Sequence, residues 1–245
     1  MGVSTYNWLH LVKYNFIQIK QTLKNLLYLL IFVFLFGNCK KETTTATVVT
    51  VYDVDGNTYS PVVIGSQTWL TTNLKTTKYK DGIPIAPTTD NIAWKNLSIG
   101  GSSWYNNDVT NKNTYGELYN WTAVATGNLC PAGWHVPTDA DWTILSAYLG
   151  GDAVSGGKLK ETGTTHWLSP NTGATNETGF LALPGGSRSG TTGIFSNVGS
   201  GSGWWSSTSN GNSSAWLRSL AKDSSGLNRS SDGINGGYSV RCVKD

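Results

Sequence analysis

Charge is scarce in this sequence. Charged residues make up 13% of the 245 positions, about half of what a soluble globular protein usually carries. The formal net charge of +3 comes from the first 38 residues, which hold Lys13, Lys20 and Lys24 and no acidic residue. The rest of the chain is formally neutral and has no counterion-release drive toward DNA or RNA, so a nucleic-acid partner is excluded.

The signatures of common enzyme chemistry are also absent. The chain has no Gly-rich phosphate loop and no His-Glu-x-x-His motif. His135 is interpreted as a hydrogen-bonded structural residue, because no Ser, Cys or Asp partner is marked for it. His166, beside Trp167, is a slightly better catalytic candidate, but its neighbours are loop residues. We therefore expect a domain that is not an enzyme and that needs no metal and no cofactor.

Small polar and aromatic residues take the place of charge. The sequence has 29 Gly, 11 Trp and 11 Tyr, with many Ser, Thr and Asn. So much aromatic surface can be buried that it offsets the entropy of ordering the chain, which argues against disorder. The composition is typical of an extracytoplasmic β-rich domain with a neutral surface.

The N-terminal segment reads as an export signal. An apolar run at 26–37 follows the acid-free, lysine-bearing stretch, as in a secretory signal. The run is shorter than the roughly 20 apolar residues that a membrane-spanning helix needs. Residues 35–39 resemble a bacterial lipobox, in which Cys39 would be the lipid-bearing first mature residue. We predict a signal peptide at 1–38, a lipidated cysteine and linker at 39–49, and a domain at 50–245; an ordinary transmembrane anchor is the alternative.

Two further inferences follow from the lipid anchor. The charged residues 40–42 resemble a lipoprotein surface-export signal, so we expect the protein on the bacterial outer membrane or cell surface, held by its N-terminal lipid. With Cys39 used for lipid, Cys130 and Cys242 remain, and two cysteines in an exported chain indicate one disulfide. A two-cysteine catalytic or metal site is the less favoured interpretation.

The start of the domain predicts a hairpin. Residues 48–59 are rich in β-branched side chains around Asp55-Gly56, a strong turn signal, and residues 62–64 are expected to form the returning strand before a second turn at 65–66. Asp53, Asp55 and Asn57 also allow a calcium loop. Such a loop needs a Glu at its twelfth position, where Ile64 stands, so the hairpin is favoured.

Two helices and a set of strands follow. A capping box at 114–117 predicts a helix through Trp121 to Ala125, and a second cap at Thr138 predicts a helix that Gly150-Gly151 ends. The spacing of Trp121 and Trp142 assigns both to the core. Short apolar segments at 179–184, 203–207, 214–218 and 238–243 alternate like half-buried antiparallel strands joined by long loops.

Several longer motifs carry a family resemblance. They include Asp-x-Asp-Gly-Asn-x-Tyr at 53–59, Ile-Gly-x-Gln-x-Trp-Leu-x-x-Asn-Leu at 64–74, Trp-Tyr-Asn-Asn-Asp at 104–108, Tyr-Gly-x-Leu-Tyr-Asn-Trp at 115–121, Leu-Cys-Pro-x-Gly-Trp-His-Val-Pro-Thr at 129–138 and Ser-Val-Arg-Cys-Val at 239–243. In this order they resemble the major paralogous domain family named after Fibrobacter succinogenes, over about residues 50–245. The resemblance implies an exported protein.

Part of this pattern is similar to a wider superfamily. The motifs at 133–142, 183–186 and 240–242 resemble the sulfatase-modifying-factor domain, a variant of the C-type lectin fold. The resemblance implies an α+β fold with two helices packed on a twisted antiparallel sheet and a long loop region. It also implies a bridge from Cys130 to Cys242. An enzyme of the formylglycine-generating type is a remote alternative, because its reactive cysteine pair is missing.

The late loops supply the candidate ligand site. Sugars present apolar faces and hydroxyl edges, which suit flat rings beside short polar side chains. The candidate residues are Trp204, Trp205, Trp216, Asn210, Asn212, Asp223, Asn228, Arg229 and Asp232. The less specific interpretation is that Trp204 and Trp205 alternate, one inward and one outward, and that the Asn and Asp residues make turns.

We therefore predict a non-catalytic binding domain, with polysaccharide binding or adhesion favoured and a surface protein as another partner. A structural or protein-interaction head of an envelope complex is the alternative. A binder should show an exposed concave aromatic cluster, whereas a structural head should show an apolar patch or an unpaired sheet edge.

Overall fold

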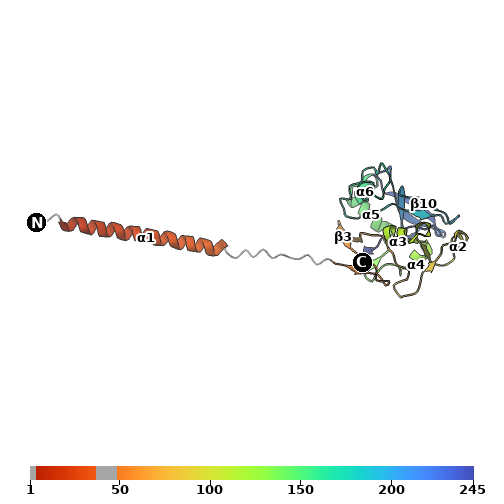
Figure 1. Ribbon diagram of the computed structural model, residues 1–245, viewed down its shortest axis with the longest axis horizontal. Helices are drawn as coiled ribbons and strands as arrows, with labels where there is room; N and C mark the ends of the chain where they lie inside the picture. The colour runs from red at the N-terminus through yellow and green to blue at the C-terminus, as the bar shows by residue number, and fades with distance from the viewer. Residues whose placement is uncertain (1–3, 37–48) are drawn as a thin grey trace. The chain divides into compact units, whose positions relative to one another are not determined.

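The computed structural model describes residues 4–36 and 49–245. The chain forms two compact units, Met1–Thr47 and Val48–Asp245. The first contains helix α1 (Ser4–Phe36), shown in Figure 1. Among the described residues, no helix combines the length and the apolarity needed to cross a membrane. Cys39 lies outside the described residues, so its lipidation stays a prediction.

The second unit is built on a five-stranded sheet with the strand order β10-β9-β11-β12-β13. Neighbouring strands are antiparallel, except that β9 and β11 are parallel. The strands are β9 (Gly185–Arg188), β10 (Phe195–Val198), β11 (Gly201–Ser209), β12 (Ser214–Ala221) and β13 (Asn228–Gly233). The predicted strands at 203–207 and 214–218 lie in β11 and β12. The strand predicted at 179–184 is wrong as a strand, because these residues form only an isolated pairing of Ala182 with Lys160.

Three smaller sheets complete the unit. Their orders are β1-β2, β3-β4-β14-β8 and β5-β6-β7. The strands are β1 (Val51–Tyr52), β2 (Thr58–Tyr59), β3 (Pro61–Ile64), β4 (Gln67–Leu70), β5 (Ala86–Pro87), β6 (Gly101–Ser103), β7 (Leu118–Tyr119), β8 (Trp134–His135) and β14 (Val243–Lys244). The fold is therefore α+β, as predicted, but its strands form four sheets and not one.

The turn at Asp55-Gly56 is confirmed, with a different return strand. β1 pairs with β2 across it, whereas residues 62–64 lie in β3 and pair with β4 across the turn at 65–66. In the alternative interpretation as a calcium loop, the Asp53 carboxylate would be a ligand, but it already accepts hydrogen bonds from the protein. Asp53 accepts hydrogen bonds from two backbone N–H groups, from Asn57 Nδ2 and from the Tyr59 hydroxyl.

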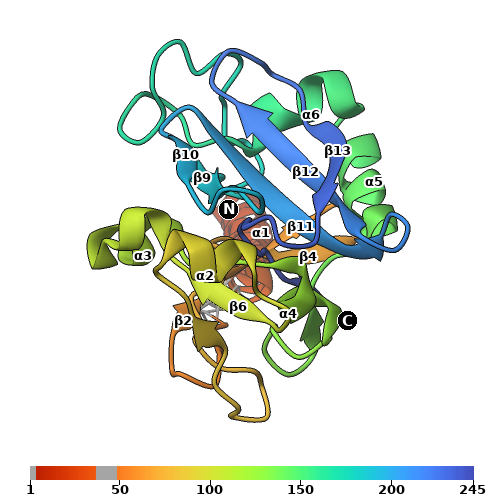
Figure 2. The same cartoon turned by 90° about the vertical axis from the view of Figure 1, so that its right-hand side faces the viewer.

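Helix α5 (Asp139–Tyr148) begins where the sequence predicts. Thr138 Oγ1 accepts from the backbone N–H of Asp141, and the Asp141 carboxylate accepts from that of Thr138. Trp142 and Leu145 face inward and are buried. Figure 2 shows α5 and α6 (Asp152–Leu159) along one side of the long strands, where α5 contacts β11 and β12 and α6 contacts β13.

The helix predicted from Thr114 is wrong. Instead α3 (Val109–Tyr115) ends there, because Gly116 adopts a φ of 84°. A Cβ at Gly116 would lie 2.8 Å from the Leu74 carbonyl oxygen, so only glycine fits. The chain then forms β7 and starts again as α4 (Trp121–Ala125), capped by Asn120. The remaining short helices are α2 (Asn91–Lys95) and η1 (Tyr105–Asn107).

Two cores lie on opposite faces of the five-stranded sheet. The helix-side core comprises Ile64, Trp69, Trp142, Leu145, Leu149, Leu159, Trp167, Phe180, Ala182, Trp204, Leu220, Leu227 and Val243. The disulfide-side core comprises Tyr59, Leu70, Leu74, Ile85, Tyr119, Ala123, Val124, Leu129, Cys130, Trp134, Val136, Trp205, Ala215, Leu217, Val240 and Cys242. Trp142 is therefore core, as predicted, and Trp121 packs partly buried against the disulfide-side core.

The predicted disulfide is present. Cys130 and Cys242 are bonded across a sequence separation of 112, and both are buried. The bridge ties the loop before β8 to the last segment of the chain. In the chain-entropy description, a loop of this length stabilises the fold by about 4 to 5 kcal/mol.

Candidate functional site

The predicted aromatic surface is buried. Trp204 and Trp205 project to opposite faces of β11, as strand alternation requires, but both are 0% exposed because each face carries a core. Trp204 packs 6.4 Å from Trp142 between ring centroids, and Trp205 stands edge-on at 4.8 Å from Tyr238. Both indole N–H groups donate to partners inside the domain. Neither ring can stack on a ligand, so the prediction that these two residues bind ligand is wrong.

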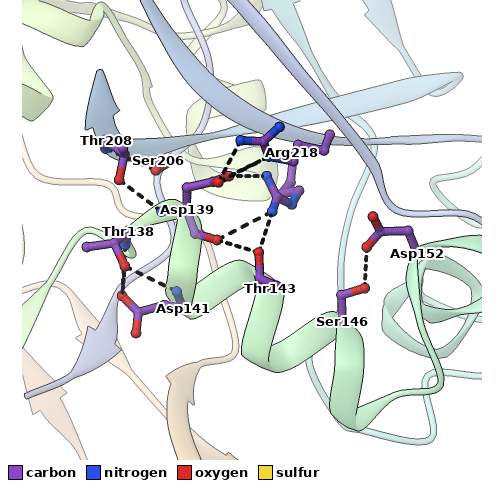
Figure 3. A network of polar contacts seen from close by, with 10 residues as sticks. Thr138, Asp139, Asp141, Thr143, Ser146, Asp152, Ser206, Thr208 and Arg218 are labelled. Carbon is purple, nitrogen blue, oxygen red and sulfur yellow. Dashed lines mark hydrogen bonds and ion pairs between the residues drawn. The ribbon is translucent and has the colours of Figure 1, made fainter. Parts of the chain in front are cut away.

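Trp216 and Arg229 belong to a polar network beside α5. The Arg229 guanidinium carbon lies 3.4 Å from the centroid of the half-buried Trp216 ring and covers it. Arg229 Nη2 donates to Asp139 Oδ2 at 2.8 Å. The buried Arg218 donates to Asp139 Oδ1 at 2.6 Å, as Figure 3 shows. Thr143 accepts a further hydrogen bond from Arg218. These contacts join β12 and β13 to the first turn of α5.

The charges of this network support one another. Burial alone would raise the pKa of Asp139, but hydrogen bonds from Arg229 and Arg218 hold it below its usual value. Figure 3 also shows the Thr138–Asp141 cap and the contact of Ser146 with Asp152 further along the helix. The network fixes α5 on the sheet, which is a structural role.

The remaining candidates are not brought to one place. Asn210 and Asn212 lie in the β11–β12 turn, and Asp223 lies in the β12–β13 turn at the other end of the sheet. Asn228 begins β13 and, with Arg229, lines a hollow of about 350 Å³ beside α6. Asp232 alone of the nine candidates lines a cavity of about 720 Å³.

That cavity forms one end of a groove on the disulfide side of the sheet. The larger cavity, about 720 Å³, lies among β9, β10 and the end of β13. A smaller one, about 340 Å³, continues over β11 and β12. Ser187, Asn197 and Tyr238 line both, so the two cavities are neighbours, and together we call them the groove. Each of the two volumes taken by itself falls within the range of small-ligand sites.

Asp232 and Tyr238 form a fixed polar pair in this groove. The Tyr238 hydroxyl donates to Asp232 Oδ2 at 2.8 Å, and the backbone N–H of Gly233 donates to Oδ1 at 2.8 Å. Burial raises the pKa of Tyr238 well above its usual value, and the neighbouring carboxylate adds to the effect. The tyrosine therefore stays protonated and holds the carboxylate in place.

Arg188 forms the back of the larger cavity. It is buried, and its guanidinium carbon lies 4.5 Å from the ring centroids of both Trp94 and Phe195. Its Nε donates to the Gly193 carbonyl, and its Nη atoms donate to the carbonyls of Thr88 and Thr89 and to the Asn91 side chain. Burial lowers its pKa to about 10. Arg188 thus holds α2 and the β9–β10 turn against the sheet.

Small residues make the groove floor. Gly201, Gly203, Ser219 and Ser230 line the smaller cavity. A Cβ at Gly203 would lie 2.6 Å from the Tyr238 ring, so the glycine lets the tyrosine lie directly on β11. This floor was not predicted from the sequence, because serine and glycine in a loop-rich segment are typical of turns and do not indicate a surface.

The family motifs serve the fold. Asn73 Oδ1 accepts hydrogen bonds from Trp204 Nε1 at 2.8 Å and from Arg241 Nη2 at 2.8 Å. Arg241 is 1% exposed and also donates to the carbonyls of Leu70 and Phe180. These motif residues connect the beginning, middle and end of the domain, and none of them reaches the groove.

Neither His135 nor His166 lines the groove. His135 Nδ1 lies 2.7 Å from Asp245 Oδ1, and its Nε2 lies 3.3 Å from Asp141 Oδ2. His166 Nδ1 lies 2.9 Å from both carboxylate oxygens of Glu161. In the described part of the chain, no three His, Cys, Asp or Glu side chains gather as a metal site would require.

Fold and groove define the class: an α+β domain with two cores, one disulfide and an open polar groove. Residues 62–244 match the Fibrobacter succinogenes major domain, and the chain belongs to this family. The match spans all the strands of the groove. No curated protein and no solved structure matches the chain.

Proposed function

We propose that the protein is an exported, lipid-anchored surface protein whose domain binds an extracellular ligand in the polar groove, with a polysaccharide as the favoured ligand. The observation that carries the proposal is the groove itself, whose lining residues come from all five strands of the sheet, from β13 to β10. Hydroxyl, amide and carboxylate groups line it beside the half-buried Tyr238 ring. Such a lining can exchange hydrogen bonds with many sugar hydroxyls.

The proposal includes the finer fold assignment and the location. The helices α5 and α6 on one face of the long strands, and a cysteine before β8 bonded to one beside the last strand, support a variant of the C-type lectin fold. The signal-like segment at 1–38 and the lipobox-like Cys39 support export and anchoring at the outer membrane or cell surface.

A structural or protein-interaction head is the second candidate. Val63, Ile144 and Tyr148 are exposed, at 71%, 48% and 65%. Tyr148 lies over Gly65, which brings α5 close to the β3–β4 turn that follows Val63. The other feature expected of such a head is a free sheet edge. The edge strand β13 carries Arg229 and Asp232, and charge on an edge disfavours pairing with another chain.

Adjacent serines on β13 provide the test. Ser230 lines the groove, and Ser231, next in the strand, points to the helix side, where its cross-strand neighbour is Trp216. The full chain in detergent is titrated with a polysaccharide panel, with and without chelator. Ser230→Trp should fill the floor and weaken binding at least tenfold, whereas Ser231→Trp should leave it unchanged. Equal effects of both variants would place the site elsewhere, and no binding by the unmodified chain would reject the polysaccharide proposal.

A further inference from the structure

The groove has few charged side chains, and they differ in whether a ligand could bind to them. Among the described residues that line the two cavities, Arg188 and Asp232 are the only charged side chains. All three nitrogens of the Arg188 guanidinium already donate to oxygens of Thr88, Thr89 and Asn91, at the start of α2, and of the β9–β10 turn. Arg188 is 1% exposed, and its guanidinium carbon lies 4.5 Å from the centroids of two aromatic rings. A ligand carboxylate or sulfate therefore finds no free cation to pair with.

Asp232 has the opposite character. Each of its carboxylate oxygens accepts one hydrogen bond from the protein, from Tyr238 or Gly233. An ionised carboxylate oxygen has about two lone-pair sites, so each oxygen can accept a second donor. Two neighbouring hydroxyl groups of a sugar present two such donors. An anionic ligand group at the same place would instead meet a like charge in a partly desolvated site.

We propose that the groove binds uncharged glycan chains and discriminates against acidic ones, with Asp232 as the residue that determines this specificity. The inference rests on the proposed glycan-binding function and adds the class of glycan to it. The hydroxyl-rich walls serve any sugar chain. The discrimination comes from the single available charge, which is negative.

Pairs of polysaccharides that share a backbone and differ in charge test this preference. Hydroxyethyl cellulose and carboxymethyl cellulose share a backbone, as do methyl-esterified and de-esterified galacturonan. The full chain in detergent should bind the uncharged member of at least one pair at least tenfold more tightly. Equal or tighter binding of the acidic member would overturn the inference while leaving glycan binding intact. Binding to no member of either pair, or of the wider polysaccharide panel, would reject the proposed function as well.

Variants then assign the effect to Asp232. Asp232→Asn keeps an acceptor for Tyr238 and removes the charge, so the preference for the uncharged member should fall to within about twofold. Asp223→Asn removes an exposed carboxylate from the β12–β13 turn, outside the groove, and should change neither affinity. Asn197→Asp adds a charge to the wall shared by both cavities and should strengthen rejection of the acidic member. If Asp232→Asn weakens both ligands equally, Asp232 is a contact residue and does not determine the charge preference, and the inference fails.

Discussion

The helix-side core and the disulfide-side core each cover one face of the five-stranded sheet, but only the second contains a cross-link. Four tryptophans and Phe180 fill the helix side, and Trp69 and Trp142 lie 4.8 Å apart between ring centroids. The disulfide side holds Trp134, Trp205, Tyr59 and Tyr119, with smaller aliphatic residues and the bridge. Aromatic packing stabilises the native state directly, whereas a cross-link acts largely on the unfolded chain.

This difference accounts for the position of the groove. Helices α5 and α6 cover the helix side of the long strands. The other side is covered only in part, by Tyr238 and its neighbours, and the uncovered strip over Gly201, Ser219 and Ser230 is the groove floor. A bridge that restrains the unfolded chain lets this side remain partly open. Stability and a binding surface thus come from different faces of one sheet.

The two adjacent tryptophans of β11 test this comparison with the largest expected effect. Trp204→Ala and Trp205→Ala should each lower the free energy of unfolding by about 3 to 5 kcal/mol, because each removes a fully buried ring. Urea unfolding monitored by circular dichroism measures the change. The control Tyr148→Ala removes a ring that is 65% exposed and should cost about 1 kcal/mol or less. A loss near that of the control for either tryptophan would mean that its core tolerates the void.

These two residues also show what sequence reasoning could reach. Alternation along β11 correctly put Trp204 and Trp205 on opposite faces, and the turn signals and the Thr138 cap correctly located the first two turns and the start of α5. What a strand pattern does not tell is whether the second face is covered. That depends on Tyr238, which pairs with Tyr119 and reaches β11 only through tertiary folding.

The helices that the sequence did not predict correctly have two different causes. The segment at 114–125 has the residues of a capping box, but Glu117 is buried beside Lys112 and Gly116 stops the helix. The helix α6 contains Gly156 and Gly157, which disfavour a helix by propensity. A Cβ at these positions would lie 2.2 Å from the Gly226 oxygen and 2.3 Å from the Gly173 oxygen. Close backbone packing requires both glycines, and no local rule reveals it.

Breaking the network beside α5 should lower the free energy of unfolding almost as much as removing a buried aromatic ring. Asp139→Ala leaves Arg218, 1% exposed, without its carboxylate partner, and should lower the free energy of unfolding by about 3 to 5 kcal/mol. Arg229→Ala removes the exposed partner of the same carboxylate and should cost about 1 kcal/mol or less, an effect that salt should reduce further. Urea titrations at low and high ionic strength separate the two. Equal losses would show that burial does not distinguish these two ion pairs.

A pH titration should reveal the buried acid of the disulfide side of the molecule. Burial raises the pKa of Glu117 to about 7, against the attraction of Lys112 at 3.0 Å, while Asp55 raises it further. A carboxyl with a raised folded-state pKa contributes stability that is fully present below its unfolded value of 4.5 and is lost as the pH rises through 7. The loss between pH 5 and pH 8 should be on the order of 3 kcal/mol.

Two variants assign this pH dependence. Glu117→Gln should remove most of the decline between pH 5 and pH 8, because the side chain can no longer ionise. Lys112→Met removes the nearest cation and should extend the decline to higher pH. Thermal unfolding across the pH range provides the measurement. An unchanged slope in Glu117→Gln would assign the decline to other groups.

Close approaches at glycine offer the finest comparison of the two sides. An added Cβ at Gly156 on the helix side would meet the backbone of Gly226 at 2.2 Å, whereas at Gly203 on the groove side it would meet the Tyr238 ring at 2.6 Å. A ring can tilt and a packed backbone cannot, so Gly156→Ala should cost about 3 kcal/mol and Gly203→Ala about 1 kcal/mol. Gly233→Ala, with its nearest neighbour at 3.9 Å, should change stability by no more than about 0.5 kcal/mol. Chemical denaturation ranks the three variants. If Gly203→Ala costs as much as Gly156→Ala, Tyr238 is held as firmly as backbone, and the groove wall that it forms is rigid before any ligand binds.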